Sequence, residues 1–295
     1  MKEEDGVAAV VALMLILAVI VTFLSLYATT YLPALKQQAE IAQVSEVKEA
    51  FMRFDSDLEH ILSEKTNLTY GEMVPLGGGD ILLNPSKSSG TIWVGMPEEL
   101  YTLSYNSGTG TETYTGSMVN VTYEPSFSYW ESQGYSWQYG YINVTKGSGK
   151  RATPLSFRTR ADAESRVQEY GGKFLSVTPV ENSSAPGYLR ELVVTAVSVD
   201  RIPEETEISG SGAGTLRAES GVSESSWQTN ELTITVVEST PFAGSLASRV
   251  NGLNGVGNVT VTTPSAGQYI LTFKDTNLYP VNLTLRKVKV TVSVR

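Results

Sequence analysis

The feature that most constrains this chain is a charge-free apolar run near its N-terminus. From Val7 to Leu35 no residue is charged, and the run contains no glycine and a single proline, Pro33. As a helix that rises ~1.5 Å per residue, its most apolar part, Val7 to Tyr27, is about 30 Å long, which matches the hydrocarbon core of a bilayer. Apolar side chains lie all round this helix, so we expect lipid or a wholly apolar protein environment around it.

A cleaved secretory signal is a weaker interpretation of the same run. Such signals begin with basic residues and have a short apolar core. Here the run follows the stub MKEEDG, which has three acids and one lysine, and the apolar core is about twice too long.

A second helical pattern follows Pro33. Six apolar residues are spaced 3, 4, 3, 4 and 3 apart and so share one helix face: Val44, Val47, Phe51, Phe54, Leu58 and Ile61. We predict one nearly continuous helix over residues 7–64, roughly 85 Å long, which is apolar all round at first and amphipathic afterwards. The amphipathic part is either a stalk that packs on this chain's own domain or a surface that packs on copies of itself.

Short alternating runs rich in Val, Ile, Thr and Tyr dominate the rest of the chain, with Gly, Pro, Asn and Ser between them. The runs are residues 81–83, 91–95, 100–105, 118–124, 141–145, 189–199, 231–237, 258–263, 268–274 and 282–294. Two helical patterns interrupt them, Arg160–Tyr170 and Pro241–Leu253, the second with Thr240 as a candidate cap.

These patterns predict an α+β fold. Residues 1–6 form a short stub, residues 7–64 the long helix, and residues 65–295 an antiparallel, β-rich, sandwich-like domain. A division of that domain into two lobes near residues 180–187 is an alternative that the sequence leaves open.

Composition excludes several classes of protein. The net charge is -9 and no Lys/Arg run exceeds two residues, so the basic stripe that nucleic-acid binding needs is missing. The chain has no cysteine, which excludes disulfides, thiolate metal sites and cysteine nucleophiles.

Glycosylation sequons indicate which side of a membrane the β-rich part occupies. Six of the twelve asparagines head an Asn-x-Ser/Thr triplet, and all six follow the apolar run: Asn67, Asn120, Asn143, Asn182, Asn258 and Asn282. Because glycans are added outside the cytoplasm, we expect the β-rich part outside and Met1 inside. The alternative is that threonine-rich strands produce such triplets through composition alone.

One aromatic segment stands out, YEPSFSYWESQGYSWQYGYINVT, which we interpret as two strands around Ser132-Gln133-Gly134. Its Tyr and Trp side chains suit an adhesion surface or a subunit interface, with four main candidates: Tyr129, Trp130, Tyr135 and Trp137. The alternative is cross-strand stacking within the sheet.

Catalytic and cofactor signals are weak. His60 is the only histidine, so a histidine-based triad or metal site is not expected. The segment GSGAG at 210–214 lacks the Lys-Ser/Thr of a phosphate loop and is predicted to be a turn. The acidic pairs at 55/57 and 204/205 leave calcium open, without the spacing of a calcium loop. We expect no cofactor other than N-linked glycans.

An acidic stub ending in Gly6, the run GVAAVVALMLILAVIVTFLSLY, the amphipathic EIAQVSEVKEAFMRFDSDL and a β domain together resemble an archaeal type IV pilin-like protein. The resemblance implies cleavage between Gly6 and Val7 by a prepilin peptidase and assembly by pilus machinery. It also implies that the apolar helices bundle as a filament core, with glycosylated domains facing outward. Acids occupy positions 3–5, where the family usually has a basic residue just upstream of the cleavage site.

Three hypotheses follow. The first is a pilin-like structural subunit of an archaeal surface filament, held in the membrane before assembly. The second is a single-pass surface or adhesion protein that does not polymerise, with its C-terminal domain outside. The third, a surface enzyme that uses only carboxylates, needs convergent acids in a pocket.

Overall fold

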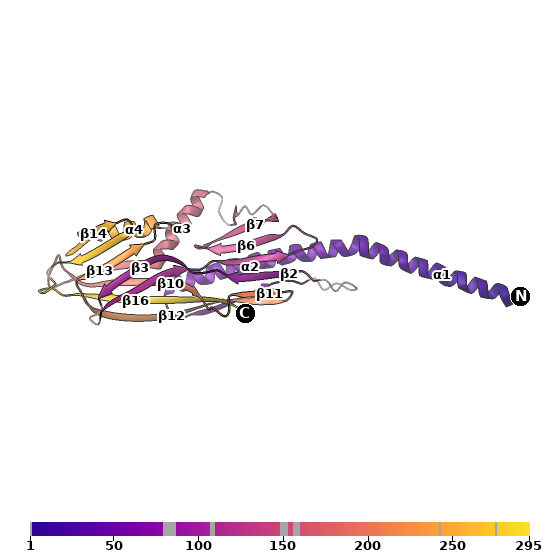
Figure 1. Cartoon of the computed structure of the whole chain (residues 1–295), viewed down its shortest axis with the longest axis horizontal. Coiled ribbons are helices and arrows are strands. Elements are labelled where there is room, and N and C mark those ends of the chain that lie inside the picture. The colour runs from indigo at the N-terminus through magenta and orange to yellow at the C-terminus, as the bar shows by residue number, and fades with distance from the viewer. Residues whose placement is uncertain are drawn as a thin grey trace.

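The computed structural model of the chain describes residues 2–78, 87–106, 110–147, 153–155, 160–241, 243–274 and 276–295. One long helix runs into an elongated β-rich domain and extends far beyond it on one side (Figure 1). The predicted α+β class is confirmed: a long N-terminal helix precedes a β-rich domain of three mostly antiparallel sheets.

The N-terminal helix is nearly continuous, as predicted. It consists of α1 (Lys2–Leu26), a π-helical turn η1 (Tyr27–Tyr31) and α2 (Leu32–Glu64). It ends at Lys65, whose left-handed φ of 53° closes the last turn with a 2.9 Å bond from its N–H to the Ile61 carbonyl. The helix begins at Lys2, so residues 2–6 continue it and do not form a separate stub.

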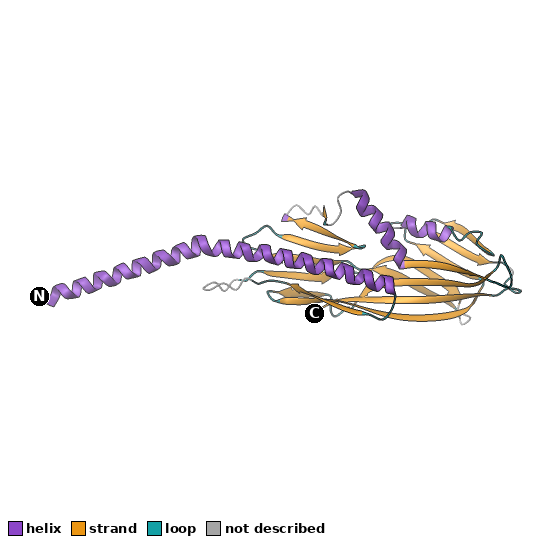
Figure 2. Cartoon of the chain, turned by 180° about the vertical axis from the view of Figure 1, so that it is seen from behind, coloured by secondary structure: helices purple, strands orange, loops and turns teal. Residues whose placement is uncertain are grey.

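The helix bends at η1, between its two straight halves (Figures 1 and 2). Pro33, the second residue of α2, has no N–H to donate to the preceding turn, where its ring also crowds the backbone. The Leu32 N–H instead bonds to the Tyr27 carbonyl five residues back, and the Thr29 hydroxyl donates to the Ser25 carbonyl at 2.7 Å. Proline and π-turns are the usual causes of helix bends, and both occur here.

Three sheets form the domain. The β16 sheet has the order β1 (Thr69–Pro75), β12 (Ala213–Thr229), β16 (Val281–Val294), β10 (Leu189–Arg201), β9 (Leu175–Glu181). The β6 sheet has the order β11 (Glu207–Gly210), β2 (Ser89–Val94), β5 (Val121–Ser126), β6 (Gln133–Gln138), β7 (Tyr141–Lys146), β8 (Thr153–Pro154). The β13 sheet has the order β14 (Val259–Ser265), β15 (Gln268–Phe273), β13 (Glu231–Val236), β3 (Glu98–Asn106), β4 (Thr111–Met118).

Two short helices complete the domain. They are α3 (Arg160–Phe174) and α4 (Ala243–Asn251), which contact each other and β9. Both were predicted, but α3 continues past Tyr170 and α4 is shorter than expected. The Thr240 hydroxyl donates to the Val237 carbonyl at 2.9 Å, and the Thr240 carbonyl accepts the N–H of Ala243, the first residue of α4, at 3.1 Å.

The pairing of the strands corrects three details of the sequence analysis. The pair β10–β16 is parallel, from Glu191 opposite Asn282 to Arg201 opposite Val292. The aromatic segment turns at Tyr139-Gly140, between β6 and β7, whereas Gln133 and Gly134 lie inside β6. Residues 180–187 fall in and beside the turn of the β9–β10 hairpin, so both sides of that segment belong to one sheet. The predicted run at 81–83 lies outside the described residues.

The amphipathic half of the helix is part of the domain core. Val47, Phe51, Phe54, Leu58 and Ile61 are at most 1% exposed, and Val44 packs partly buried beside them. Their face of α2 contacts β1 on one side and β6 and β7 on the other. The Phe54 ring meets the edge of the Trp137 ring at 5.4 Å between centroids. Within this chain, therefore, the apolar face of α2 packs on its own domain.

We expect Phe54→Ala to lower the free energy of unfolding of the full chain in detergent by about 3–5 kcal/mol, because it leaves a cavity under Trp137. Leu17→Ala is the matched control, since Leu17 is 61% exposed on α1 and touches no part of the domain core. Chemical denaturation followed by tryptophan fluorescence measures both. Equal effects of the two substitutions would contradict the assignment of α2 to the core.

Candidate functional site

The first candidate site is the N-terminal half of the helix, which no other described part of the chain covers. The large apolar side chains described between Val10 and Leu26 are 49% to 72% exposed. The most apolar 18-residue window of this helix has a mean hydropathy of 2.8 and is 0% buried. By length and composition, the helix is long and apolar enough to cross a membrane once.

One face of the helix becomes buried at the bend. Tyr31, the last residue of η1, is 58% exposed, and Leu32, the first of α2, is 8% exposed. Figure 2 shows α2 running along the domain and α1 continuing alone beyond it. One helix thus has two environments, and η1 marks the boundary between them.

Three buried polar residues of α2, which we call the polar seam, lie between the exposed half of the helix and its apolar stripe. Lys36, Glu40 and Gln43 continue the buried face of α2 toward the bend and are 4%, 3% and 6% exposed. The Gln43 amide donates to the Leu76 carbonyl and to the Tyr123 hydroxyl, both at 2.8 Å. Burial raises the pKa of Tyr123, so this hydroxyl stays protonated. Sequence analysis missed the seam because its members are polar, although they keep the spacing of the apolar stripe.

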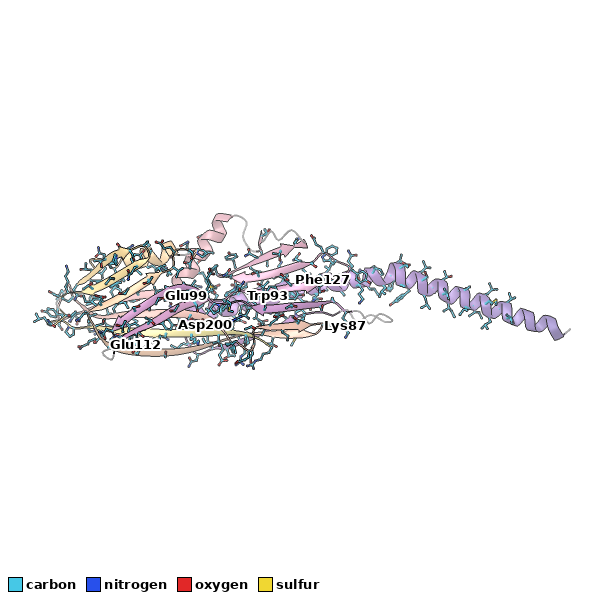
Figure 3. The ribbon with its side chains drawn as sticks, in the orientation of Figure 1. Lys87, Trp93, Glu99, Glu112, Phe127 and Asp200 are labelled. Atoms are coloured by element: carbon cyan, nitrogen blue, oxygen red, sulfur yellow. The ribbon has the colours of Figure 1, made fainter. Side chains whose placement is uncertain are left out.

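Glu40 holds a loop of the domain against the helix. Its carboxylate accepts the backbone N–H groups of Ser128, Tyr129 and Trp130 at 2.9, 3.0 and 2.6 Å. These three residues belong to the loop that joins β5 to β6. Figure 3 shows Phe127, which precedes them, at the end of the domain from which the helix emerges. A buried carboxylate with several N–H donors fixes such a loop more firmly than neutral hydrogen bonds do.

Glu40→Gln should lower the free energy of unfolding by about 1–3 kcal/mol, because an amide lacks the charge and the second acceptor oxygen that these N–H groups require. Glu46→Gln, at an exposed position of the same helix, should change it by less than about 0.5 kcal/mol. Both are measured by chemical denaturation of the full chain in detergent. If the two variants are equally stable, the Glu40 contacts do not hold the loop.

The structure separates the four candidate aromatic residues into two pairs. Tyr129 and Trp130 are 39% and 40% exposed, on the loop held by Glu40. Tyr135 and Trp137 are 1% and 0% exposed, so the prediction of an exposed adhesion or interface surface is wrong for these two. They lie on the face of β6 that packs on α2, where the Trp137 indole donates to Asp55 at 2.7 Å. Their spacing of two residues correctly predicts that they share one face of a strand. The sequence does not show that α2, which is distant along the chain, covers that face.

The six sequon asparagines differ in accessibility. Asn67 and Asn282 are exposed, Asn120, Asn143 and Asn182 are half-buried, and Asn258 is 7% exposed. The Asn258 amide is also engaged, because its oxygen accepts the Leu189 N–H at 3.1 Å and its nitrogen donates to the Lys274 carbonyl at 2.7 Å. At 7% exposure the Asn258 side chain leaves little room for a sugar on its nitrogen, so we expect no glycan at Asn258.

Glycopeptide mass spectrometry of the native protein should therefore find Asn258 unmodified, whatever the occupancy of Asn67 and Asn282. Asn258→Ala should lower the free energy of unfolding by about 1–3 kcal/mol, since the buried Leu189 N–H and the part-buried Lys274 carbonyl lose their partners. Asn282→Ala serves as the control and should have little effect. Detection of a glycan on Asn258 of the folded protein would contradict this prediction.

The remaining candidates do not converge on a chemical site. The His60 ring is exposed, with Nδ1 3.0 Å from the Tyr70 hydroxyl. Asp55 accepts the Trp137 indole, and Glu205 pairs with Arg295 at 2.6 Å. Within the described residues, no three His, Asp or Glu side chains form a group that could hold a metal ion. The GSGAG segment lies at the bend between β11 and β12.

Gly6 and Val7 both lie within α1, before the first side chain that the structure describes. Cleavage between them stays a prediction. Comparison with protein families, curated proteins and solved structures finds no match to this chain. The function is therefore inferred from the chain's own residues and their arrangement.

Proposed function

We propose that this chain is a pilin-like structural subunit of an archaeal cell-surface filament that polymerises through α1. The observation that carries the proposal is the contrast within one helix: one face of α2 is buried by its own domain, whereas the part of α1 whose side chains the structure describes, residues 10–26, is exposed on every side. No catalytic role is proposed for the domain.

The physical argument starts from the apolar surface of α1. A helix that is apolar all round is unstable in water and needs either acyl chains or other apolar helices around it. A subunit held in a membrane by α1 can leave it only if neighbouring copies supply that second environment at once. Alanines at positions 8, 9, 12 and 18 are small enough to let helix backbones approach closely.

The attachment of the domain also suits a polymer. Because α2 is embedded in the core and the Glu40 carboxylate holds a domain loop against it, the domain has a fixed position on the helix. Copies that pack through α1 would therefore place their domains in a regular array. Up to Tyr31 every side of the helix can contact neighbouring helices, whereas beyond it only the exposed face of α2 can, since Leu32 is already buried. The exposed sequons Asn67 and Asn282 suit glycosylation of domains that face outward.

The decisive experiment compares two fractions of native cells. We expect sheared surface filaments to contain this chain starting at Val7, as N-terminal sequencing would show, with electron microscopy to establish the filaments. A chain found only in detergent-extracted membranes, starting at Met1, favours the second candidate: a single-pass surface or adhesion protein that does not polymerise. The exposed Tyr129 and Trp130 are the observation that favours that alternative.

Leu17→Arg should abolish incorporation into filaments, because a charge within the bundle of apolar helices has no partner. Thr262→Arg, on an exposed part of β14, introduces the same charge far from α1 and should leave incorporation unchanged. Epitope-tagged copies in the sheared fraction measure both. Normal incorporation of the Leu17 variant would rule out assembly through α1.

A further inference from the structure

A groove of about 720 Å³ lies between the β16 sheet and β4, the edge strand of the β13 sheet. Lys287 and Lys289 of β16 stand opposite Ser223 and Gly221 of β12, so these four positions share one face of the sheet. Gly221 opens the groove, since a Cβ built at this position would have no atom within 4 Å. The Tyr114 side chain forms part of the wall.

The groove is positively charged on a strongly acidic chain. Lys287 and Lys289 form no ion pair with any residue that the structure describes. Glu219, the acid in the lining, is paired with Arg217 at 2.8 Å. Two cationic side chains are thus available for an anion, while the whole chain carries a net charge of -9.

Lys287 is held in position by the rings beside it. Its ammonium nitrogen lies 5.6 Å from the centroid of Tyr114 and 5.7 Å from that of Tyr105. A cation held over aromatic rings keeps its geometry before a ligand arrives. Lys289 is exposed at the opening of the groove.

Neutral hydrogen-bonding groups complete the lining. Thr69 and Ser223 contribute hydroxyl groups, and Asn67 contributes a side-chain amide at the edge of the groove. The Asn67 side-chain oxygen accepts the Val222 N–H at 2.8 Å, which holds this sequon side chain against β12. Hydroxyl groups, one aromatic wall and two cations in an open groove suit a ligand with many hydroxyls and a few negative charges.

We propose that this groove binds an acidic oligosaccharide, with Lys287 and Lys289 facing its carboxylate or sulfate groups. The saccharide comes either from a glycan on Asn67 of the same chain or from a separate surface polysaccharide. The inference rests on the proposed function in one respect, because a cell-surface location is where the chain would meet such sugars. Binding itself does not depend on α1 or on filament assembly.

Binding is tested with the full chain in detergent, made in a host without N-glycosylation. Tetragalacturonate is the acidic probe and cellotetraose the neutral control, both titrated by isothermal calorimetry. We expect saturable binding of tetragalacturonate that weakens with added salt, and at least tenfold weaker binding of cellotetraose. No saturable binding, or equal affinity for both probes, would overturn the proposal.

Variants locate the binding. Gly221→Leu places a side chain in the groove, where its Cβ meets no atom within 4 Å, and should abolish binding. Lys289→Ala should weaken it about fivefold through the loss of one exposed charge. Lys274→Ala removes an exposed lysine elsewhere and should leave the affinity unchanged. Because Lys289→Ala is a surface change that does not threaten folding, unaltered affinity in this variant overturns the proposal even if Gly221→Leu fails to fold.

The natively glycosylated protein identifies the source of the saccharide. If the Asn67 glycan occupies the groove, the native protein should not bind tetragalacturonate and removal of its N-glycans should restore binding. If both forms bind equally, the ligand is a separate polysaccharide. Failure of both to bind overturns the proposal. The filament experiment can fail while these titrations succeed, so the two inferences are tested separately.

Discussion

The packing of α2 against β1, β6 and β7 is the interaction on which the rest of this structure depends. Its apolar stripe contributes a whole face to the core, including Phe51 and Phe54, both at most 1% exposed. The burial of several large side chains, at about 1.5–3 kcal/mol each, makes the helix inseparable from the folded domain.

The junction between the two halves solves a physical problem. The apolar surface of α1 is followed by the apolar stripe of α2, so apolar contacts alone would not fix the residue at which the domain begins to pack on the helix. Lys36, Glu40 and Gln43 provide that point, because buried polar groups need specific partners in specific positions. The three N–H groups that bond to Glu40 and the contacts of Gln43 with Leu76 and Tyr123 fix the domain's position along the helix.

Prediction from sequence succeeded where the signal is local and failed where it depends on distant partners. The helix to residue 64 and most strands follow from periodicity alone. The 17-residue β12 was missed because its exposed positions are polar and its buried positions are mostly small or polar, as at Gly214, Ala218 and Ser220. The parallel pairing of β10 with β16 brings together segments about ninety residues apart, and no local pattern encodes such a partner.

The sequence by itself determined that a long helix, first apolar all round and then amphipathic, precedes a β-rich domain. The spacing of apolar residues and the distribution of charge carry this information, and both are properties of neighbouring residues. Only the tertiary structure decided which apolar surfaces remain exposed. Trp137 and Val11 are both apolar in sequence, yet α2 covers the first completely while the second is 50% exposed. Burial depends on what packs against a side chain, and that partner is set by the fold of the whole chain.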